Sequence, residues 1–144
     1  MPIETCAQRM VRKLHTVKPM DSLRHAREIM ETNRVNQLPV VVGGKVVGIV
    51  TDRDLRDATP SVFETSQRTS GHAAPAPDLD ALRVKDVMTE NVLTLGPSAS
   101  LADAARLMRR ERIGAIPIVD GDRLVGLVAR SDVLDAFVAM TEPH

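Results

Sequence analysis

The chain has almost no aromatic residues and a single cysteine. Of its 144 residues only Phe63 and Phe137 are aromatic, and Trp and Tyr are absent. This excludes a stacking platform for single-stranded bases, so a bound base would have to lie between aliphatic side chains. Cys6 has no second cysteine to pair with, which excludes an internal disulfide framework and favours a reducing, cytoplasmic setting.

An excess of charge and long apolar runs are also missing. Lys plus Arg number 19, and so do Asp plus Glu, so we expect neither nucleic acid nor an anionic membrane as a partner. A DNA-binding regulator is disfavoured for the same reason. No apolar run reaches the roughly 18 residues of a membrane helix. The opening MPIETCAQRMVRK scatters charges among its apolar residues and lacks the pattern of a signal peptide.

The sequence does contain an internal repeat. A shift of 78 positions aligns Met10 with Met88 without a gap. About a third of the aligned positions are identical, which composition alone does not produce. The further identities include Thr16/Thr94, Pro19/Pro97, Leu23/Leu101, Ala26/Ala104, Met30/Met108, Arg34/Arg112, Pro39/Pro117, Gly43/Gly121, Gly48/Gly126 and Asp54/Asp132. Two copies of one folding unit are therefore predicted, and a small-molecule site is expected twice, where the copies meet.

Each copy predicts the order strand, helix, strand, strand, helix. In the first copy these are residues 14–17, a helix capped by Asp21 or Ser22, strands at 38–42 and 45–50 joined by Gly43-Gly44, and a helix over 52–58. In the second copy Ser100 and Asp103 predict a capping box, strands cover 116–119 and 124–128, and a helix covers 131–138. The small, polar and proline-bearing stretch between the copies predicts a flexible linker, with a helical turn near its end. The predicted domains are 1–58, a linker over 59–85, and 86–144.

Neither a metal site nor an enzyme active site is predicted. His15, His25, His72 and His144 form no metal-ligand spacing with Cys6. No Ser or Cys has a base and an orienting group, and no glycine-rich loop precedes a Lys. We therefore expect a protein that is not an enzyme.

A basic cluster lies on the predicted helix of the second copy, at Arg106, Arg109, Arg110 and Arg112. Two interpretations stay open: the cluster docks an acidic partner or phosphates, or it is a solvated helix face, which is the more common case.

The doubled motifs resemble a pair of cystathionine-β-synthase-type (CBS) domains, a tandem called a Bateman module. The resemblance lies in LPVVV and GKVVGIVTDRDL of the first copy and MTENVLTLGP and IPIVDGDRLVGLVARSDVL of the second, over residues 8–58 and 86–138. Among stand-alone tandems, the short length and the DATPS-containing linker are most similar to the acetoin-utilisation type. The resemblance implies an α/β fold of two β-α-β-β-α units related by a pseudo-twofold axis. It also implies a homodimer and a regulatory ligand, AMP, ADP, ATP or S-adenosylmethionine, with no catalytic cofactor.

The segment Thr51-Asp52-Arg53-Asp54 comes where a strand enters a helix. Free N–H groups at a helix start suit a phosphate, and Asp54 can accept two ribose hydroxyls. Thr-x-x-Asp is equally an ordinary capping box. The resemblance favours ribose binding, because tandems of this family use Ser/Thr-x-x-Asp for that purpose.

Carried over by position, the resemblance implies two sites, each shared between the copies. The first combines Ile49, Thr51 and Asp54 with Leu93, Gly114, Ala115, Ile116 and Pro117. The second combines Leu127, Ala129 and Asp132 with His15, Asn36, Gln37, Leu38 and Pro39. Ala129 replaces the motif's Ser or Thr, so the second site lacks one contact, while Arg53 or Arg130 can reach a phosphate. His15 is either a donor to the base or phosphate or a solvent-facing residue.

The predicted function is a cytoplasmic sensor that binds an adenosine ligand between its CBS units and signals to an unidentified partner protein. The alternative is a structural dimerisation module whose ligand sites do not function. A homodimer is expected, because the last helix carries more apolar residues than one small unit can bury: Val133, Leu134, Phe137, Val138 and Met140. Whether the two chains of this dimer pair head-to-head or head-to-tail is left open.

Overall fold

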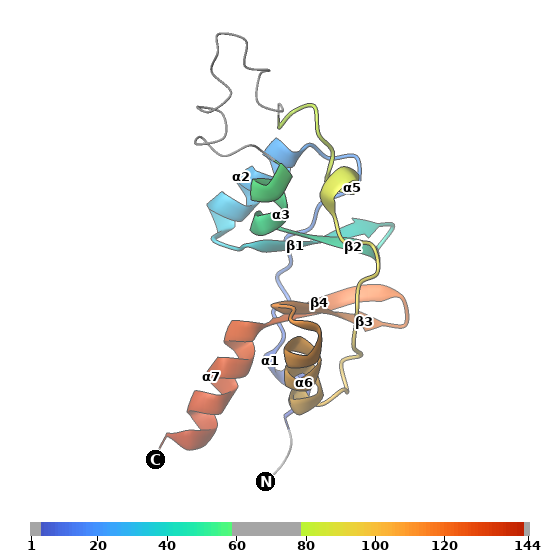
Figure 1. Cartoon of the computed structure of the whole chain (residues 1–144). Coiled ribbons are helices and arrows are strands. Elements are labelled where there is room, and N and C mark those ends of the chain that lie inside the picture. Colours follow the sequence, from blue (N-terminus) through green and yellow to red (C-terminus); the bar gives the residue numbers. More distant parts are fainter. Residues whose placement is uncertain (1–3, 59–78, 143–144) are drawn as a thin grey trace. The chain divides into compact units, whose positions relative to one another are not determined.

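The structure is a computed structural model that describes residues 4–58 and 79–142 (Figure 1). Its contacts divide the chain into two compact units. The first-repeat unit comprises His15–Gly43 and Val47–Asn91, and the second-repeat unit comprises Met1–Leu14, Gly44–Val46 and Val92–His144. The division predicted from the repeat (1–58, 59–85, 86–144) follows the sequence copies and stays a prediction; the contacts group residues 4–14 with the second copy and 86–91 with the first.

The first-repeat unit is built on a hairpin covered by helices. Its elements are α2 (Leu23–Asn33), β1 (Gln37–Val42), β2 (Lys45–Thr51, of which this unit holds the part from Val47 on), α3 (Asp52–Ala58) and α5 (Val84–Val87). The turn between β1 and β2 needs glycine, since Gly43 and Gly44 have φ of 58° and 83°. The apolar stripe of α2 packs with β1, β2 and α3 into one core: Val17, Leu23, Ala26, Met30, Leu38, Val40, Val50, Leu55 and Val84. In Figure 1, α2 and α3 lie on the same side of this hairpin.

The second-repeat unit repeats the order helix, strand, strand, helix, but its short helix precedes these elements instead of following them. These are α1 (Cys6–Arg9), α6 (Leu101–Glu111), β3 (Ala115–Asp120), β4 (Arg123–Ala129) and α7 (Arg130–Thr141). β3 and β4 pair antiparallel from Ala115 with Ala129 to Asp120 with Arg123. Their core largely repeats that of the first unit at equivalent positions, with Cys6 in the place of Val84, and Met10 is a further buried member: Cys6, Met10, Leu101, Ala104, Met108, Ile116, Ile118 and Val128.

The predicted helix caps are confirmed in one copy and half-formed in the other. Ser22 caps α2 by accepting a hydrogen bond from His25 N at 3.1 Å. Ser100 likewise accepts from Asp103 N at 3.0 Å. The full capping box predicted for α6 is wrong, because the carboxylate of Asp103 accepts from Arg106 at 2.7 Å and makes no reciprocal bond among the described residues.

The strand predicted over residues 14–17 is reduced to a single bridge. Val17 pairs with Val40 in parallel, with Val17 N donating to Pro39 O at 3.1 Å. The chain then turns at once, since Lys18 N donates to the carboxylate of Asp21 at 2.8 Å. Only one residue of the segment can therefore join the hairpin.

Each unit is completed by the segment that precedes the other copy. Val11 forms a two-bond antiparallel bridge with Leu127 in β4, at 2.8 and 3.0 Å. Thr89 forms the same bridge with Ile49 in β2, at 2.9 and 3.0 Å. Positions 11 and 89 are equivalent under the 78-residue shift, so the two copies have exchanged their lead-in segments.

A methionine from each lead-in segment packs on a strand glycine. A Cβ placed on Gly48 would lie 2.7 Å from Met88 Sδ, and a Cβ placed on Gly126 would lie 2.7 Å from Met10 Cγ. Ordinary carbon contacts are near 3.5 to 4.0 Å, so only glycine allows the methionines to lie this close. This explains why Met10/Met88 and Gly48/Gly126 are both preserved between the copies.

Candidate functional site

The strongest candidate site in the first-repeat unit is the junction of β2 and α3. Thr51 ends β2, and Asp54 lies in the first turn of α3. Together they form a complete capping box, in which Thr51 N donates to Asp54 Oδ2 at 2.8 Å and Asp54 N donates to Thr51 Oγ1 at 3.1 Å. Both residues are half-buried. The box therefore stabilises the helix start and fixes the orientation of both side chains.

The box leaves part of the hydrogen-bonding capacity of both side chains unused. Among the described residues, Asp54 bonds only through Oδ2, although a carboxylate accepts through both oxygens. The Thr51 hydroxyl accepts from Asp54, and its own hydrogen is not committed to any described residue. Capping and ribose binding, which the sequence presented as alternatives, are therefore compatible in this geometry.

Several predicted residues of the second site lie close to this junction. Asp52 N donates to Asn36 O at 2.9 Å, which holds the start of α3 against the residue before β1. Asn36 is exposed and Gln37 half-buried, so their side chains are accessible. Leu38 and Pro39 are fully buried, so they can offer a ligand only their backbone.

The equivalent junction in the second-repeat unit has only half of this capping arrangement. Ala129 N donates to Asp132 Oδ2 at 2.7 Å, but Ala129 has no hydroxyl to accept in return. Arg130 N donates to Gly114 O at 2.9 Å. Leu127, also predicted here, is held by the bridge to the N-terminal segment. This junction thus offers a ligand the carboxylate without the hydroxyl.

The remaining residues of the first predicted site lie in or before β3. Ala115, Ile116 and Pro117 are 3% exposed or less, so their side chains serve the core. Gly114 precedes the strand with its carbonyl already bonded to α7. Leu93 is 41% exposed and is the accessible apolar side chain of this group.

The predicted site residues fall into two groups, one in each unit. The first-repeat unit holds His15, Asn36, Gln37, Leu38, Pro39, Ile49, Thr51 and Asp54, and the second-repeat unit holds Leu93, Gly114, Ala115, Ile116, Pro117, Leu127, Ala129 and Asp132. Within each unit the structure brings the strand–helix junction and the entry to the preceding strand together. The sharing of each ligand between the two groups stays a prediction.

The two arginines predicted to contact phosphate differ in their surroundings. Both are exposed. Arg53 lies 3.9 Å from the carboxylate of Asp57, whereas the guanidinium of Arg130 has no hydrogen-bond or ion-pair partner among the described residues. His15 is half-buried.

Neither a metal cluster nor a membrane-spanning helix is found in the described part of the chain. Residues 4–58 and 79–142 contain no group of three or more His, Cys, Asp or Glu side chains arranged to hold a metal ion. No helix within these ranges has the length and apolar character needed to cross a bilayer.

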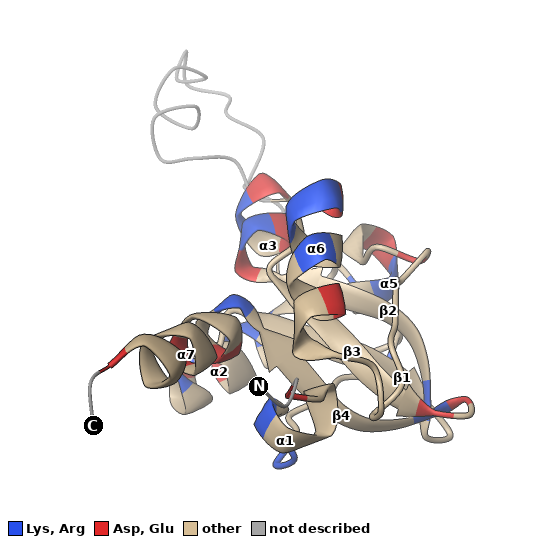
Figure 2. Ribbon diagram, turned by 90° about the horizontal axis from the view of Figure 1, so that it is seen from below, with Lys and Arg blue, Asp and Glu red and all other residues tan. Residues whose placement is uncertain are grey.

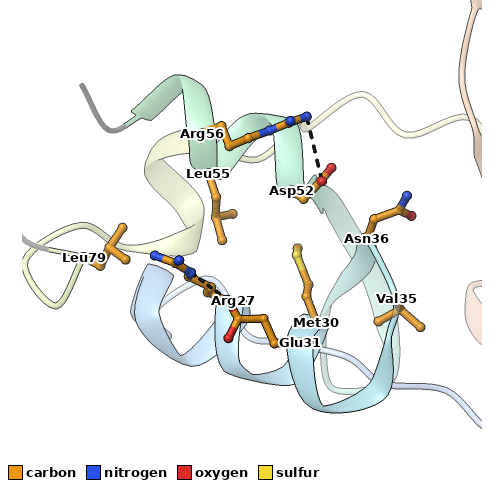
Figure 3. A pocket seen from close by; sticks show the side chains of 9 residues that line it. All are labelled: Arg27, Met30, Glu31, Val35, Asn36, Asp52, Leu55, Arg56 and Leu79. Atoms are coloured by element: carbon orange, nitrogen blue, oxygen red, sulfur yellow. Dashed lines mark hydrogen bonds and ion pairs between the residues drawn. The ribbon is translucent and has the colours of Figure 1, made fainter. Parts of the chain in front are cut away.

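A pocket of about 420 Å³ lies between α2 and α3 (Figure 3), and it was not among the predicted sites. Met30, Leu55 and Leu79 line its apolar part, and Asn36 lies at its edge. Two ion pairs border it, Arg27 with Glu31 at 3.0 Å and Arg56 with Asp52 at 3.8 Å. The i, i+4 spacing of each pair is the one signal in the sequence that indicates a charged rim here.

The repeat, the β-α-β-β-α order and the Thr-x-x-Asp junction match one known family. The family model described as the CBS domain matches residues 3–61 and 84–139. The chain belongs to the CBS-domain family. The recognition made from the sequence motifs is thus confirmed. A CBS domain-containing protein of Dictyostelium discoideum is 36% identical over 141 residues, covering 94% of this chain and 92% of that protein.

Solved structures of CBS-domain pairs share this fold. A protein described as an acetoin utilization protein (AcuB), from Vibrio cholerae, has a TM-score of 0.76 at 27% identity, covering 99% of this chain and 100% of that one. CBSX2 in complex with AMP has a TM-score of 0.76 at 29% identity, covering 96% and 99%. The CBS-domain pair of protein MJ0100, solved with 5′-methylthioadenosine and S-adenosyl-L-methionine, has a TM-score of 0.78 at 25% identity, covering 97% and 100%. Two of these relatives hold adenosine-containing ligands.

The chain also matches part of an enzyme. It is 35% identical to inosine-5′-monophosphate dehydrogenase of Korarchaeum cryptofilum, but it covers only 22% of that enzyme's length. The likeness is therefore confined to one segment of the dehydrogenase.

Proposed function

We propose that this CBS-domain protein is a non-catalytic, cytoplasmic sensor of an adenosine-containing ligand, AMP, ADP, ATP or S-adenosylmethionine. The observation that carries the proposal is the β2–α3 junction. There, Asp54 is oriented by the capping box while its second carboxylate oxygen lacks a partner among the described residues. An oriented carboxylate beside a hydroxyl suits the two adjacent hydroxyls of a ribose. The relatives solved with AMP and with S-adenosyl-L-methionine support this choice of ligand.

The site that contains Thr51 and Asp54 is proposed to bind more tightly than the one that contains Ala129 and Asp132. Both junctions present a carboxylate held by a backbone N–H, at 2.8 and 2.7 Å. Only the first adds a side-chain hydroxyl. A hydrogen bond to a neutral group contributes about 0.5–1.5 kcal/mol, which corresponds to a difference of roughly 2- to 10-fold in affinity.

Isothermal titration of AMP, ATP and S-adenosylmethionine tests the proposal. Asp54→Asn keeps an oxygen that can cap α3 but removes the charge, and it is expected to weaken the tightest ligand about 10-fold or more, because hydrogen bonds to charged groups contribute about 1.5–3 kcal/mol. Asp57→Ala is the matched control. Asp57 lies on the same helix and is exposed, and within residues 4–58 and 79–142 its carboxylate pairs only with Arg53, at 3.9 Å. Because Arg53 is a predicted phosphate contact, the control applies to S-adenosylmethionine, which has no phosphate: Asp57→Ala should leave the affinity for this ligand unchanged.

The competing function is a structural dimerisation module. It predicts no heat of binding for any of the three ligands in the wild type, and no difference between Asp54→Asn and Asp57→Ala. Its support is the fully formed capping box, which stabilises α3 whether or not a ligand binds.

Both functions include a homodimer, which we propose on the evidence of α7. This helix buries none of its residues, and Leu134, Phe137, Val138 and Met140 are 58%, 58%, 48% and 60% exposed. Such a run of large apolar side chains is typical of an interface. Ligand binding is proposed to change the contacts of this dimer with a regulated protein, to the extent that the ligand binds its two states with different affinity.

A further inference from the structure

The two units carry equivalent pockets that differ in charge. The pocket between α2 and α3 has a counterpart of about 350 Å³ between α6 and α7. Met30 and Met108 occupy the same position in the two pockets, as do Leu55 and Val133. The apolar part of the pocket is thus kept in both copies.

The charged rim is not kept. In the α2/α3 pocket, Glu31 and Asp52 each pair with an arginine of the same helix. The positions equivalent to these two acids are Arg109 and Arg130, and both line the α6/α7 pocket together with Arg112. Among the described residues none of the three guanidinium groups has an acidic partner. The α6/α7 pocket is therefore positively charged, whereas the α2/α3 pocket is balanced.

The α6/α7 face combines this charge with the exposed apolar side of α7. Figure 2 shows basic residues on α6, whereas α7 is mostly uncharged. Leu134 belongs to both features, because it lines the pocket and is 58% exposed. A partner surface for this face must offer apolar space beside carboxylates.

The α2/α3 face of a second copy has both properties. Its pocket presents Met30, Leu55 and Leu79 around an open apolar space (Figure 3). The side chains of Glu31 and Asp52 at its rim are 65% and 51% exposed. Exposed ion pairs within one helix contribute little, so these acids can also interact with incoming arginines.

Pairing the α6/α7 face with itself would have the opposite electrostatic effect. It would bring two sets of three arginines, Arg109, Arg112 and Arg130, against each other with no acid among the pocket residues. Like charges placed together across an interface oppose association and select against that pairing.

We infer that the α6/α7 face of one copy packs on the α2/α3 face of the other, so that the homodimer is head-to-tail. Apolar side chains of α7, Leu134 and Phe137 among them, enter the partner's α2/α3 pocket, and Arg109 and Arg130 face its acidic rim. This inference rests on the homodimer proposed above and determines which surfaces of the two copies meet.

The test is the dimer dissociation constant of the full chain, measured by analytical ultracentrifugation. Arg109→Glu is expected to raise it about 10-fold or more in a head-to-tail dimer, because the new carboxylate faces Glu31 and Asp52. In a dimer that pairs like faces, the same change relieves repulsion and lowers the constant. Arg110→Glu is the charge-matched control, since Arg110 is a neighbour on α6 that does not line the pocket.

Two further measurements distinguish a specific contact from a general charge effect. Adding Glu31→Arg to Arg109→Glu restores opposite charges and should return the constant to within about threefold of the wild type. The wild-type dimer should also weaken as salt is raised from low to high ionic strength, because salt screens attraction between opposite charges. Tighter association of Arg109→Glu, or equal effects of Arg109→Glu and Arg110→Glu, would overturn the head-to-tail arrangement.

The failure of this inference is distinguishable from the failure of the proposed function. A wild type that sediments as a monomer at micromolar concentration would refute the homodimer, and with it this interface, in favour of a different partner for the α6/α7 face. The titration of AMP, ATP and S-adenosylmethionine tests ligand binding separately, whatever the subunit arrangement.

Discussion

The exchange of lead-in segments predicts a specific energetic coupling between Met10 and Gly126. A methyl group added at Gly126 would lie 2.7 Å from Met10 Cγ and 3.1 Å from Met10 Cβ. Met10 is buried in the core of the second-repeat unit. Because the atoms concerned are close to the backbone, rotation at the end of the methionine side chain cannot relieve the clash. Gly126→Ala should therefore force the segment around Met10 away from β4.

The expected loss in the free energy of unfolding follows from how tightly Met10 packs on Gly126. Adding a methyl group to a tightly packed site typically costs about 1–3 kcal/mol. For a chain of this length each kcal/mol lowers Tm by about 3 °C, so Gly126→Ala should lower it by about 3–9 °C. Met10→Ala alone should cost about 2–5 kcal/mol through the cavity it leaves. In the double variant the new methyl group occupies part of that cavity, so the combined loss should be smaller than the sum by about 0.5–3 kcal/mol.

Urea denaturation of the wild type, both single variants and the double variant measures this coupling as a double-mutant cycle. The control cycle combines Gly126→Ala with Met88→Ala, whose side chain packs on Gly48, and should be additive within about 0.5 kcal/mol. A neutral Gly126→Ala, or additivity of Gly126→Ala with Met10→Ala, would refute the contact and the exchange of segments that it represents.

Three other changes have predictable outcomes. Ala129→Thr should complete the half-formed box with Asp132 and raise the free energy of unfolding by about 0.5–2 kcal/mol in a thermal melt, and Thr51→Ala should lower it by a similar amount. Burial, with a smaller contribution from Asp103, raises the pKa of Cys6 above its ordinary value of 9.0, so the thiol should resist alkylation until the chain unfolds. Since the unfolded thiol ionises first, stability should fall as the pH rises past that value. Arg34→Gly should raise Tm slightly, because Arg34 has a left-handed φ of 54° that glycine adopts without strain, and an unchanged or lower Tm would contradict this.

Most of the secondary structure was predictable from the repeat and from local chemistry. The helix predicted over 52–58 is α3, and the glycine turn at positions 43 and 44 lies between β1 and β2. These elements follow from signals a few residues long: β-branched runs, Gly-Gly, and a helix-starting Thr-x-x-Asp. Capping and ribose binding by Thr51 and Asp54 could not be separated in the sequence, because the same residue pattern serves both. The structure shows the capping box and a carboxylate oxygen that the box does not use, so the two roles are compatible.

The features that the sequence analysis missed depend on contacts between distant residues. Helix α1 is only four residues long and is held by backbone bonds from Cys6 N and Ala7 N to residues 99 and 97, so no local periodicity marks it. The strand expected over residues 14–17 failed because the turn at Lys18 and Asp21 follows immediately. The charge difference between the helix pockets was present in the sequence as Glu31/Arg109 and Asp52/Arg130, but it became informative only when these positions were seen to line equivalent pockets.

The crossing of Val11 to β4 and of Thr89 to β2 has a consequence for how such a chain could have arisen. A single ancestral half would have left β2 or β4 without the bridge to a lead-in segment, because in the present chain the segment that forms this bridge comes from the other copy. Two identical short chains that exchanged their lead-in segments would have formed a domain-swapped dimer. Joining them end to end would then have made the exchange intramolecular, and cutting the present chain at the repeat boundary should yield fragments that bind each other.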